Sequence, residues 1–195
     1  QAQDAIKAFE TAKGFETTKG QAAAIEATLT GTGRIQVIQG DAGAGKSTAF
    51  SAVYQAVSQL DNVEIRGFGF QGKAAAELER SSGIRSQTID SFLLTKSEKS
   101  QEGVRQLWVV DEASMVSTRH MSSMLDRAVS ENAQIVLVGD GKQIASIGAG
   151  RLFNDLQEYG LVNTSIMDEV RRQKTDYTID VAKALKDHDI EKAYR

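Results

Sequence analysis

Gly40-Asp41-Ala42-Gly43-Ala44-Gly45-Lys46-Ser47 is the stretch of sequence that decides the fold. A short β-branched run at 34–39 precedes it, and a segment with apolar residues at helical spacing, 47–60, follows it. Glycines leave room for backbone N–H groups to surround a polyphosphate, and the positive end of the following helix faces the same charge. Between a strand and a helix, the pattern G-x-x-x-x-G-K-[ST] predicts a phosphate-binding loop.

The rest of the chain repeats the alternation of strand and helix. Residues 1–30 are expected to be a helical lead-in that breaks at Gly14 and Gly20, and 31–195 are expected to form a single domain. Within it, 81–102 is weakly patterned and is interpreted as a candidate small insertion. Such alternation indicates an α/β fold, a parallel β-sheet flanked by helices. The further strands are expected at 63–70, 106–110, 134–138 and 163–167, and the further helices at 73–80, 117–130, 151–159 and 177–186.

Composition restricts the chemistry. A chain of 195 residues fits one domain, and the absence of cysteine excludes disulfides and thiolate catalysis. Only two histidines are present, so a zinc site is not expected and any metal would have oxygen ligands. The net charge of −3 gives no basic footprint for nucleic acid. No apolar run approaches the roughly 20 residues of a membrane span and no signal peptide is recognisable, which favours a cytoplasmic protein without membrane insertion.

The expected site combines the loop with acidic residues that follow the strand at 106–110. Lys46 would reach the β- and γ-phosphates of a nucleotide, and the Ser47 hydroxyl would ligate Mg²⁺. Asp111 would also hold Mg²⁺, and Glu112 would act as general base for the attacking water. The alternative is a pair of solvated acids at a strand end.

Two further polar residues are candidates for sensing the γ-phosphate. Gln143, in Gly139-Asp140-Gly141-Lys142-Gln143, carries an amide that can contact it, although a polar turn is the simpler interpretation. Arg172, in Arg171-Arg172-Gln173, could neutralise its charge, or could simply begin an exposed basic helix.

Taken in order, these motifs resemble one family. The chain resembles the first motor domain of superfamily 1B DNA helicases of the RecD type in four motifs. These are Gly-x-x-x-x-Gly-Lys-Ser at 40–47, Asp-Glu-Ala-Ser-Met-Val at 111–116, Gly-Asp-x-x-Gln at 139–143 and Arg-Gln at 172–173. The likeness is strongest to conjugative relaxase-helicases of the TraI and TrwC family of bacterial plasmids. It implies a RecA-like P-loop NTPase fold, domain 1A, with ATP and Mg²⁺ as cofactors. By that likeness Gln21 would read adenine, Arg172 and Gln143 would belong to the fourth and third motifs, and the remaining ATP contacts would come from Gly40, Gly43, Gly45, Lys46, Ser47 and Thr48.

The chain departs from the family where the DNA contact is expected. The family's Pro-Thr-x-x-Ala-Ala is here Phe70-Gln71-Gly72-Lys73-Ala74-Ala75, and Gln-Leu-Pro-Ser of the third motif is Gln143-Ile144-Ala145-Ser146. Candidates for binding single-stranded DNA are Phe70, Lys73 and Thr88.

Two functions remain open from the sequence. The first is the leading motor domain of an ATP-dependent 5′–3′ DNA helicase or translocase within a plasmid conjugative relaxase, a hydrolase whose isolated segment is not expected to unwind DNA. Its partners would be single-stranded DNA, a second RecA-like domain and a relaxase domain of the same polypeptide, and the conjugative secretion machinery. The alternative is a vestigial RecD-like domain that binds single-stranded DNA or serves conjugative transfer without ATPase activity. A P-loop kinase or GTPase is disfavoured, since the sequence contains no Asn-Lys-x-Asp.

Overall fold

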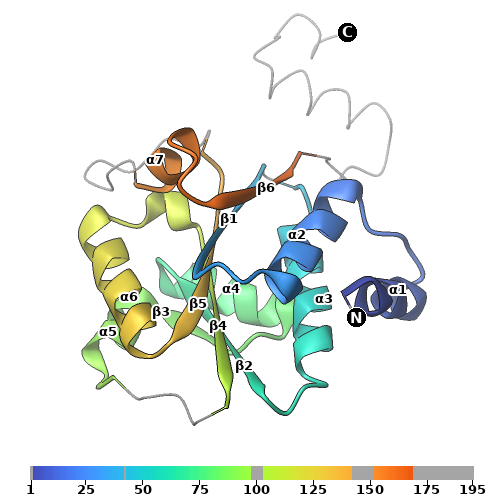
Figure 1. The fold of residues 1–195 in the computed structure, drawn as a ribbon, viewed down its shortest axis with the longest axis horizontal. Coiled ribbons are helices and arrows are strands. Elements are labelled where there is room, and N and C mark those ends of the chain that lie inside the picture. Colours follow the sequence, from blue (N-terminus) through green and yellow to red (C-terminus); the bar gives the residue numbers. More distant parts are fainter. Residues whose placement is uncertain (1, 42, 98–102, 142–151, 169–195) are drawn as a thin grey trace, which may run out of the picture.

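A parallel β-sheet forms the centre of the molecule (Figure 1). The computed structural model describes residues 2–41, 43–97, 103–141 and 152–168. These residues form a six-stranded sheet in the order β3-β2-β4-β5-β1-β6, and every paired strand runs parallel to its neighbour. The expected α/β fold is therefore confirmed. The strands are β1 (Ile35–Gly40), β2 (Val63–Gly69), β3 (Ser86–Thr88), β4 (Arg105–Asp111), β5 (Ala133–Gly139) and β6 (Asn163–Met167).

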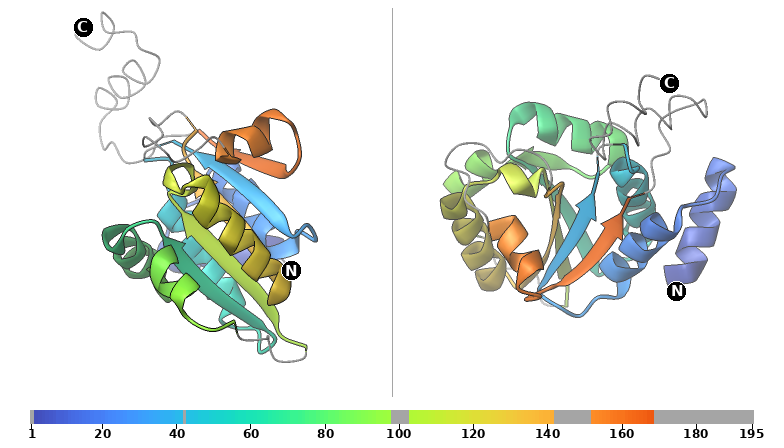
Figure 2. Two further views of the ribbon diagram at one scale, coloured as in Figure 1. Left: turned by 90° about the vertical axis from the view of Figure 1, so that its left-hand side faces the viewer. Right: turned by 90° about the horizontal axis from the view of Figure 1, so that it is seen from above.

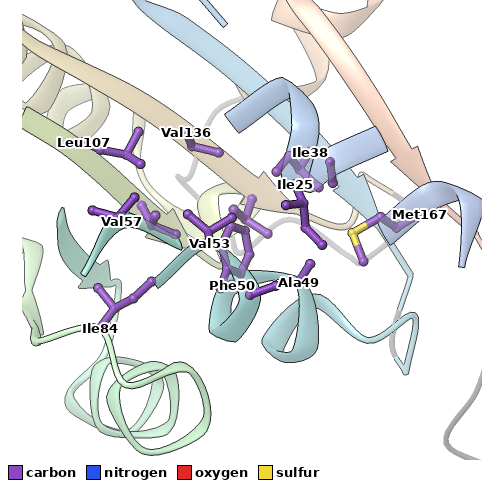
Figure 3. Close-up of a cluster of buried hydrophobic side chains, with 14 of the residues drawn as sticks. Ile25, Ile38, Ala49, Phe50, Val53, Val57, Ile84, Leu107, Val136 and Met167 are labelled. Carbon is purple, nitrogen blue, oxygen red and sulfur yellow. The ribbon is translucent and has the colours of Figure 1, made fainter. Parts of the chain in front are cut away.

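Helices cover both faces of this sheet, as the view from above in Figure 2 shows. On one face lie α1 (Ala2–Lys13), α2 (Lys19–Thr30), α3 (Lys46–Val57) and α4 (Gly72–Ser82), which contribute to one buried cluster. On the other face lie α5 (Ile89–Leu94), the short 3₁₀ helix η1 (Ala113–Met115), α6 (Thr118–Ser130) and α7 (Leu152–Glu158), which contribute to a second cluster. Figure 3 shows part of the first cluster, which includes Phe50 and Val53 of α3 and Val136 of β5.

The central strands are apolar along their whole length because both of their faces are covered. In β4, Leu107 and Val109 belong to the first cluster, whereas Trp108 and Val110 belong to the second. Side chains alternate between the faces of a strand, so a strand buried on both sides needs an unbroken apolar run. This is the reason that the sequence pattern located β4 and β5 within one residue at each end.

The lead-in helices differ from expectation at Gly20. The prediction of a break at Gly20 was wrong, because α2 begins at Lys19 and is capped by Thr18, which precedes it. Glycine serves a different purpose here: a Cβ at this position would lie 2.8 Å from the carbonyl oxygen of Ile166 on β6. The missing side chain therefore lets α2 pack closely against the edge strand of the sheet, a contact between distant parts of the sequence.

Part of the weakly patterned segment 81–102 belongs to the sheet and its core. β3 pairs with β2, and the ring of Phe92 on α5 lies with its centroid 4.6 Å from that of Phe68 and 5.0 Å from that of Trp108. Neither β3 nor α5 was predicted, since three and six residues are too few to show a clear period. The helix predicted at 177–186 lies outside the described residues.

Within the part of the chain that the structure describes, no helix is both long and apolar enough to cross a membrane.

Candidate nucleotide-binding site

The loop after β1 begins at the carboxyl edge of the sheet and ends where α3 starts. Gly43 and Gly45 have φ angles of +84° and +82°, in the left-handed region that favours glycine. The Lys46 ammonium donates a hydrogen bond to the carbonyl oxygen of Gly40, at 2.8 Å, so the side chain folds back over the loop. A Cβ on Gly40 would lie 2.9 Å from Lys46 Cδ. The glycines of the motif thus serve the backbone turn and the path of the lysine.

A cavity of about 230 Å³ opens beside this loop. It forms because β1 and β4 end at the same edge of the sheet with only β5 between them, so that residues following each strand face one space. Most of the predicted phosphate and metal residues meet there. Its lining consists of Gly43, Gly45, Lys46, Ser47, Glu77, Asp111, Glu112, Ser114, Gly139 and Asp140. Gly40 and Thr48 lie at the ends of the same segment, at the end of β1 and in the first turn of α3.

The two acidic residues at the end of β4 share one electrostatic environment. Burial raises the pKa of Asp111, while the backbone N–H of Glu112, which donates to Asp111 Oδ1 at 2.9 Å, and the charge of Lys46 both act to lower it. The pKa of Glu112 is also raised, first by burial and then by the neighbouring Asp111 charge. Glu112 has a φ of +52°, an uncommon conformation for a side chain other than glycine or asparagine. A raised pKa suits a carboxylate that must accept a proton.

The chemistry of the lining suits Mg²⁺ bound jointly with phosphate. Ser47 and Asp111 supply hydroxyl and carboxylate oxygens, which are the ligands that Mg²⁺ prefers. No group of three or more histidine, cysteine, aspartate or glutamate residues arranged to hold a metal occurs among the described residues. Mg²⁺ at nucleotide sites commonly takes one or two protein oxygens and completes its shell with phosphate and water. The residues present therefore fit this ion.

Gln21 lies at the loop, but its carboxamide already has partners. Its Oε1 accepts a hydrogen bond from the backbone N–H of Thr18 at 2.9 Å, and Thr18 Oγ1 accepts from the N–H of Gln21 at 3.1 Å. Its Nε2 is within reach of the carbonyl oxygens of Ala44, at 3.4 Å, and Gly45, at 3.3 Å. The residue is only 2% exposed. Gln21 thus joins the start of α2 to the phosphate loop.

Four residues of the cavity lining were not among the predicted site residues, namely Gly139 and three with polar side chains. Glu77 reaches it from α4, and its carboxylate pairs with Arg80 at 2.7 Å. Ser114 has a buried hydroxyl with no hydrogen-bond partner among the described residues. Asp140 accepts a hydrogen bond from Gln39 Nε2 of β1 at 3.3 Å. The acid of Gly139-Asp140 was visible in the motif, whereas nothing in the sequence around Glu77 indicated the cavity.

None of the candidate DNA residues is part of the cavity lining; they lie near the carboxyl ends of β2 and β3. Lys73 is exposed in the first turn of α4. Phe70 is half-buried and packs against the second core cluster, and the Thr88 hydroxyl accepts a hydrogen bond from the backbone N–H of Ser91 at the start of α5. Gln143 and Arg172 lie outside the described residues.

Comparison with known proteins identifies the family and several relatives of this chain. The AAA domain family matches residues 16–195. The conjugal transfer protein TraA of Rhizobium radiobacter is 35% identical over 158 residues, which cover 80% of this chain and 14% of TraA. The multifunctional conjugation protein TraI of Escherichia coli K12 is 32% identical over 184 residues, covering 90% of the chain and 10% of TraI. The RecBCD enzyme subunit RecD of Mycolicibacterium smegmatis is 37% identical over 107 residues, covering 55% of the chain and 18% of RecD.

Among solved structures, the Pif1 helicase from Candida albicans superposes with a TM-score of 0.60 at 18% sequence identity. The alignment covers 87% of this chain and 44% of that one, and it supports the assignment of the fold. The chain thus corresponds to a small part of the curated relatives it matches.

Proposed function

We propose a function for this chain, which belongs to the AAA domain family and is a helicase-like P-loop domain related to TraA, TraI and RecD. In this proposal it is the first motor domain of an ATP-dependent 5′–3′ DNA helicase or translocase of a conjugative relaxase. The observation that carries the proposal is the convergence of the loop, Lys46, Asp111 and Glu112 on one cavity. A second RecA-like domain of the parent polypeptide would complete the motor.

Each residue of the cavity has a defined task in this proposal. The loop N–H groups and Lys46 bind the nucleotide phosphates, for which the lysine exchanges its hydrogen bond to Gly40 for one to phosphate. Ser47 and Asp111 hold Mg²⁺, which supplies charge neutralisation of the phosphates when bound. Glu112 orients the attacking water and accepts its proton. The buried Ser114 hydroxyl supplies one further hydrogen-bonding group beside these carboxylates.

Single-stranded DNA would bind along the carboxyl ends of β2 and β3, beyond the nucleotide cavity. Lys73 supplies the exposed positive charge there, with Phe70 and Thr88 beside it. α4 bears Lys73 in its first turn and Glu77 in the nucleotide cavity, so one rigid helix spans the two proposed sites.

The first experiment measures binding of a fluorescent ATP analogue with Mg²⁺ to the chain and to Lys46→Ala. We expect saturable binding that Lys46→Ala abolishes, while the exposed control Lys13→Ala on α1 binds normally. Loss in both variants, or unchanged binding by Lys46→Ala, would refute the assignment of this loop.

The second experiment separates the motor domain from the vestigial DNA-binding domain. Anisotropy of a labelled single-stranded oligonucleotide is measured with and without ATP–Mg²⁺, for the chain and for Lys73→Ala. The substitution should lower the slope of log affinity against log salt by about 0.7, since one phosphate contact is lost. DNA binding without any nucleotide binding would favour the vestigial domain, for which the replacement of the family's Pro-Thr by Phe70-Gln71 is the sequence evidence.

A further inference from the structure

We propose that the Ser114 hydroxyl contacts the terminal phosphate of a bound nucleoside triphosphate and thereby distinguishes a triphosphate from a diphosphate. This inference rests on the proposed function in one respect, namely that the loop after β1 binds nucleotide phosphates. Ser114 is the middle residue of η1, the short 3₁₀ helix that follows Asp111 and Glu112.

The first argument is the state of this hydroxyl in the free chain. Ser114 Oγ is buried and has no hydrogen-bond partner among the described residues. A serine hydroxyl can donate one hydrogen bond and accept two, and burying it with none of them opposes folding. The backbone of η1 is held without it. Met115 N–H donates to the carbonyl oxygen of Glu112 at 2.8 Å, and Val116 N–H donates to that of Ala113 at 3.2 Å.

The second argument is the position of η1 at the carboxyl edge of the sheet. A Cβ at Gly139, the last residue of β5, would lie 3.0 Å from the backbone nitrogen of Ser114, so η1 packs directly on the end of β5. In the sheet β5 lies between β4 and β1. Ser114 therefore lies over the strand that separates Asp111 from the phosphate loop. A serine side chain has one torsion with three staggered rotamers, so the hydroxyl can turn toward a ligand without a change of backbone.

The third argument is the scarcity of proton donors in the cavity. Its described lining contains four acidic side chains, those of Glu77, Asp111, Glu112 and Asp140. Ionised carboxylates only accept hydrogen bonds. The side chains of the described lining that can donate to a phosphate are those of Lys46, Ser47 and Ser114. Because Lys46 and Ser47 already have tasks at the phosphates and at Mg²⁺ in the proposed function, Ser114 is the donor that remains.

The fourth argument identifies the phosphate that Ser114 would contact. In the proposed function Glu112, two residues earlier, activates the water that attacks the terminal phosphate, so this phosphate must lie beside η1. Its charged oxygens would accept the hydroxyl proton in a hydrogen bond stronger than one between neutral groups. A diphosphate bound to the same loop has no phosphate at this place. Ser114 should therefore contribute to the affinity for a triphosphate alone.

The test measures the affinities for β,γ-methylene ATP and for ADP, each with Mg²⁺, by isothermal titration calorimetry. The chain is compared with Ser114→Ala and with the matched control Ser82→Ala. Ser82 is also a serine with a buried hydroxyl, but it donates to the carbonyl oxygen of Leu78 at 2.6 Å and accepts from the N–H of Ile84 at 3.2 Å. Urea unfolding of each protein is recorded without nucleotide.

Ser114→Ala should weaken the triphosphate analogue about tenfold, the loss expected for one hydrogen bond to a charged group, and should change the affinity for ADP by less than about twofold. Its urea midpoint should equal or exceed that of the parent chain, because the substitution breaks no hydrogen bond of the free chain. Ser82→Ala should behave in the opposite way, with a lower urea midpoint and both affinities unchanged.

The inference is overturned, while the proposed function stands, if the parent chain binds both nucleotides and Ser114→Ala leaves the ratio of the two affinities unchanged. A urea midpoint of Ser114→Ala that falls as far as that of Ser82→Ala would also overturn it, since the hydroxyl would then have a structural role. Failure of the parent chain to bind either nucleotide would refute the proposed function and this inference with it.

Discussion

Arg127 on α6 and Glu131, the residue after that helix, form a buried ion pair whose removal tests how α5 is held. The Glu131 side chain is 0% exposed and that of Arg127 is 10% exposed, with Nε 2.7 Å from Glu131 Oε1. The guanidinium also donates to the carbonyl oxygens of Phe92, Thr95 and Lys96, at 2.6, 2.8 and 2.7 Å, and lies 3.9 Å from the centroid of the Phe92 ring. The Arg127 side chain thus binds both the end of α5 and the segment that follows it.

The perturbation is Arg127→Met, which retains most of the apolar stem and removes the charge. It removes the positive charge from the buried Glu131 carboxylate, whose Oε1 still accepts a hydrogen bond from the Ser97 hydroxyl at 3.0 Å. Breaking a buried ion pair in this way costs about 3–5 kcal/mol of unfolding free energy. The double variant Arg127→Met/Glu131→Gln has no buried carboxylate that lacks its cationic partner, although the bonds to the three carbonyls are still lost. It should therefore recover about 1–3 kcal/mol relative to the single variant.

The assay is urea unfolding followed by the fluorescence of Trp108, the one tryptophan of the chain, which is fully buried beside Phe92. Glu131→Gln alone supplies the fourth corner of the double-mutant cycle. A loss below about 1 kcal/mol for Arg127→Met, the size expected of an exposed pair, would refute the reasoning. So would a double variant that is no more stable than Arg127→Met.

Three further predictions follow from the geometry of the cavity and its surroundings. Burial raises the pKa of Asp111 above its ordinary value of 3.8. In the pH window between 3.8 and the raised pKa, the folded chain keeps a proton that the unfolded chain has lost, so the free energy of unfolding falls as the pH rises through that window. Urea unfolding against pH should show Asp111→Asn gaining stability over the parent above that window, and an equal difference between the two proteins at every pH would contradict this. Gly69→Ala should destabilise the fold by about 1–3 kcal/mol, because the new Cβ would lie 2.4 Å from the backbone nitrogen of Ala75 on α4; a variant with the parent's melting temperature would show that α4 shifts freely. Glu77→Gln should strengthen binding of metal-free tripolyphosphate up to about fivefold at low salt and not at high salt, because the substitution removes one exposed negative charge from the cavity lining. A gain that persists at high salt would argue against a charge effect.

Local patterns were sufficient for the elements that build the candidate nucleotide site. The loop glycines predicted a turn between β1 and α3, and the apolar runs at 106–110 and 134–138 predicted β4 and β5 because both faces of these strands are covered. Acidic residues after β4 could be placed beside the loop from the sequence, since the ends of parallel strands share one edge of the sheet.

Short elements escaped prediction for a physical reason. β3 and α5 are too brief to show a period. β3 is held by its pairing with β2, and α5 is held by Phe92, which packs on Phe68 and Trp108, residues distant in sequence. Gly20 suggested a helix break, yet it lies inside α2, where the absent side chain admits the backbone of Ile166.

The sequence by itself determined the fold class and predicted the phosphate loop with its lysine, hydroxyl and acidic residues, because each depends on spacing along a single strand, turn or helix. Only the tertiary structure decided that Glu77 faces the cavity and that Gln21 is buried against the carbonyls of Ala44 and Gly45. Both depend on how one helix packs against a loop from another part of the chain, and packing between separate elements leaves no period in the sequence.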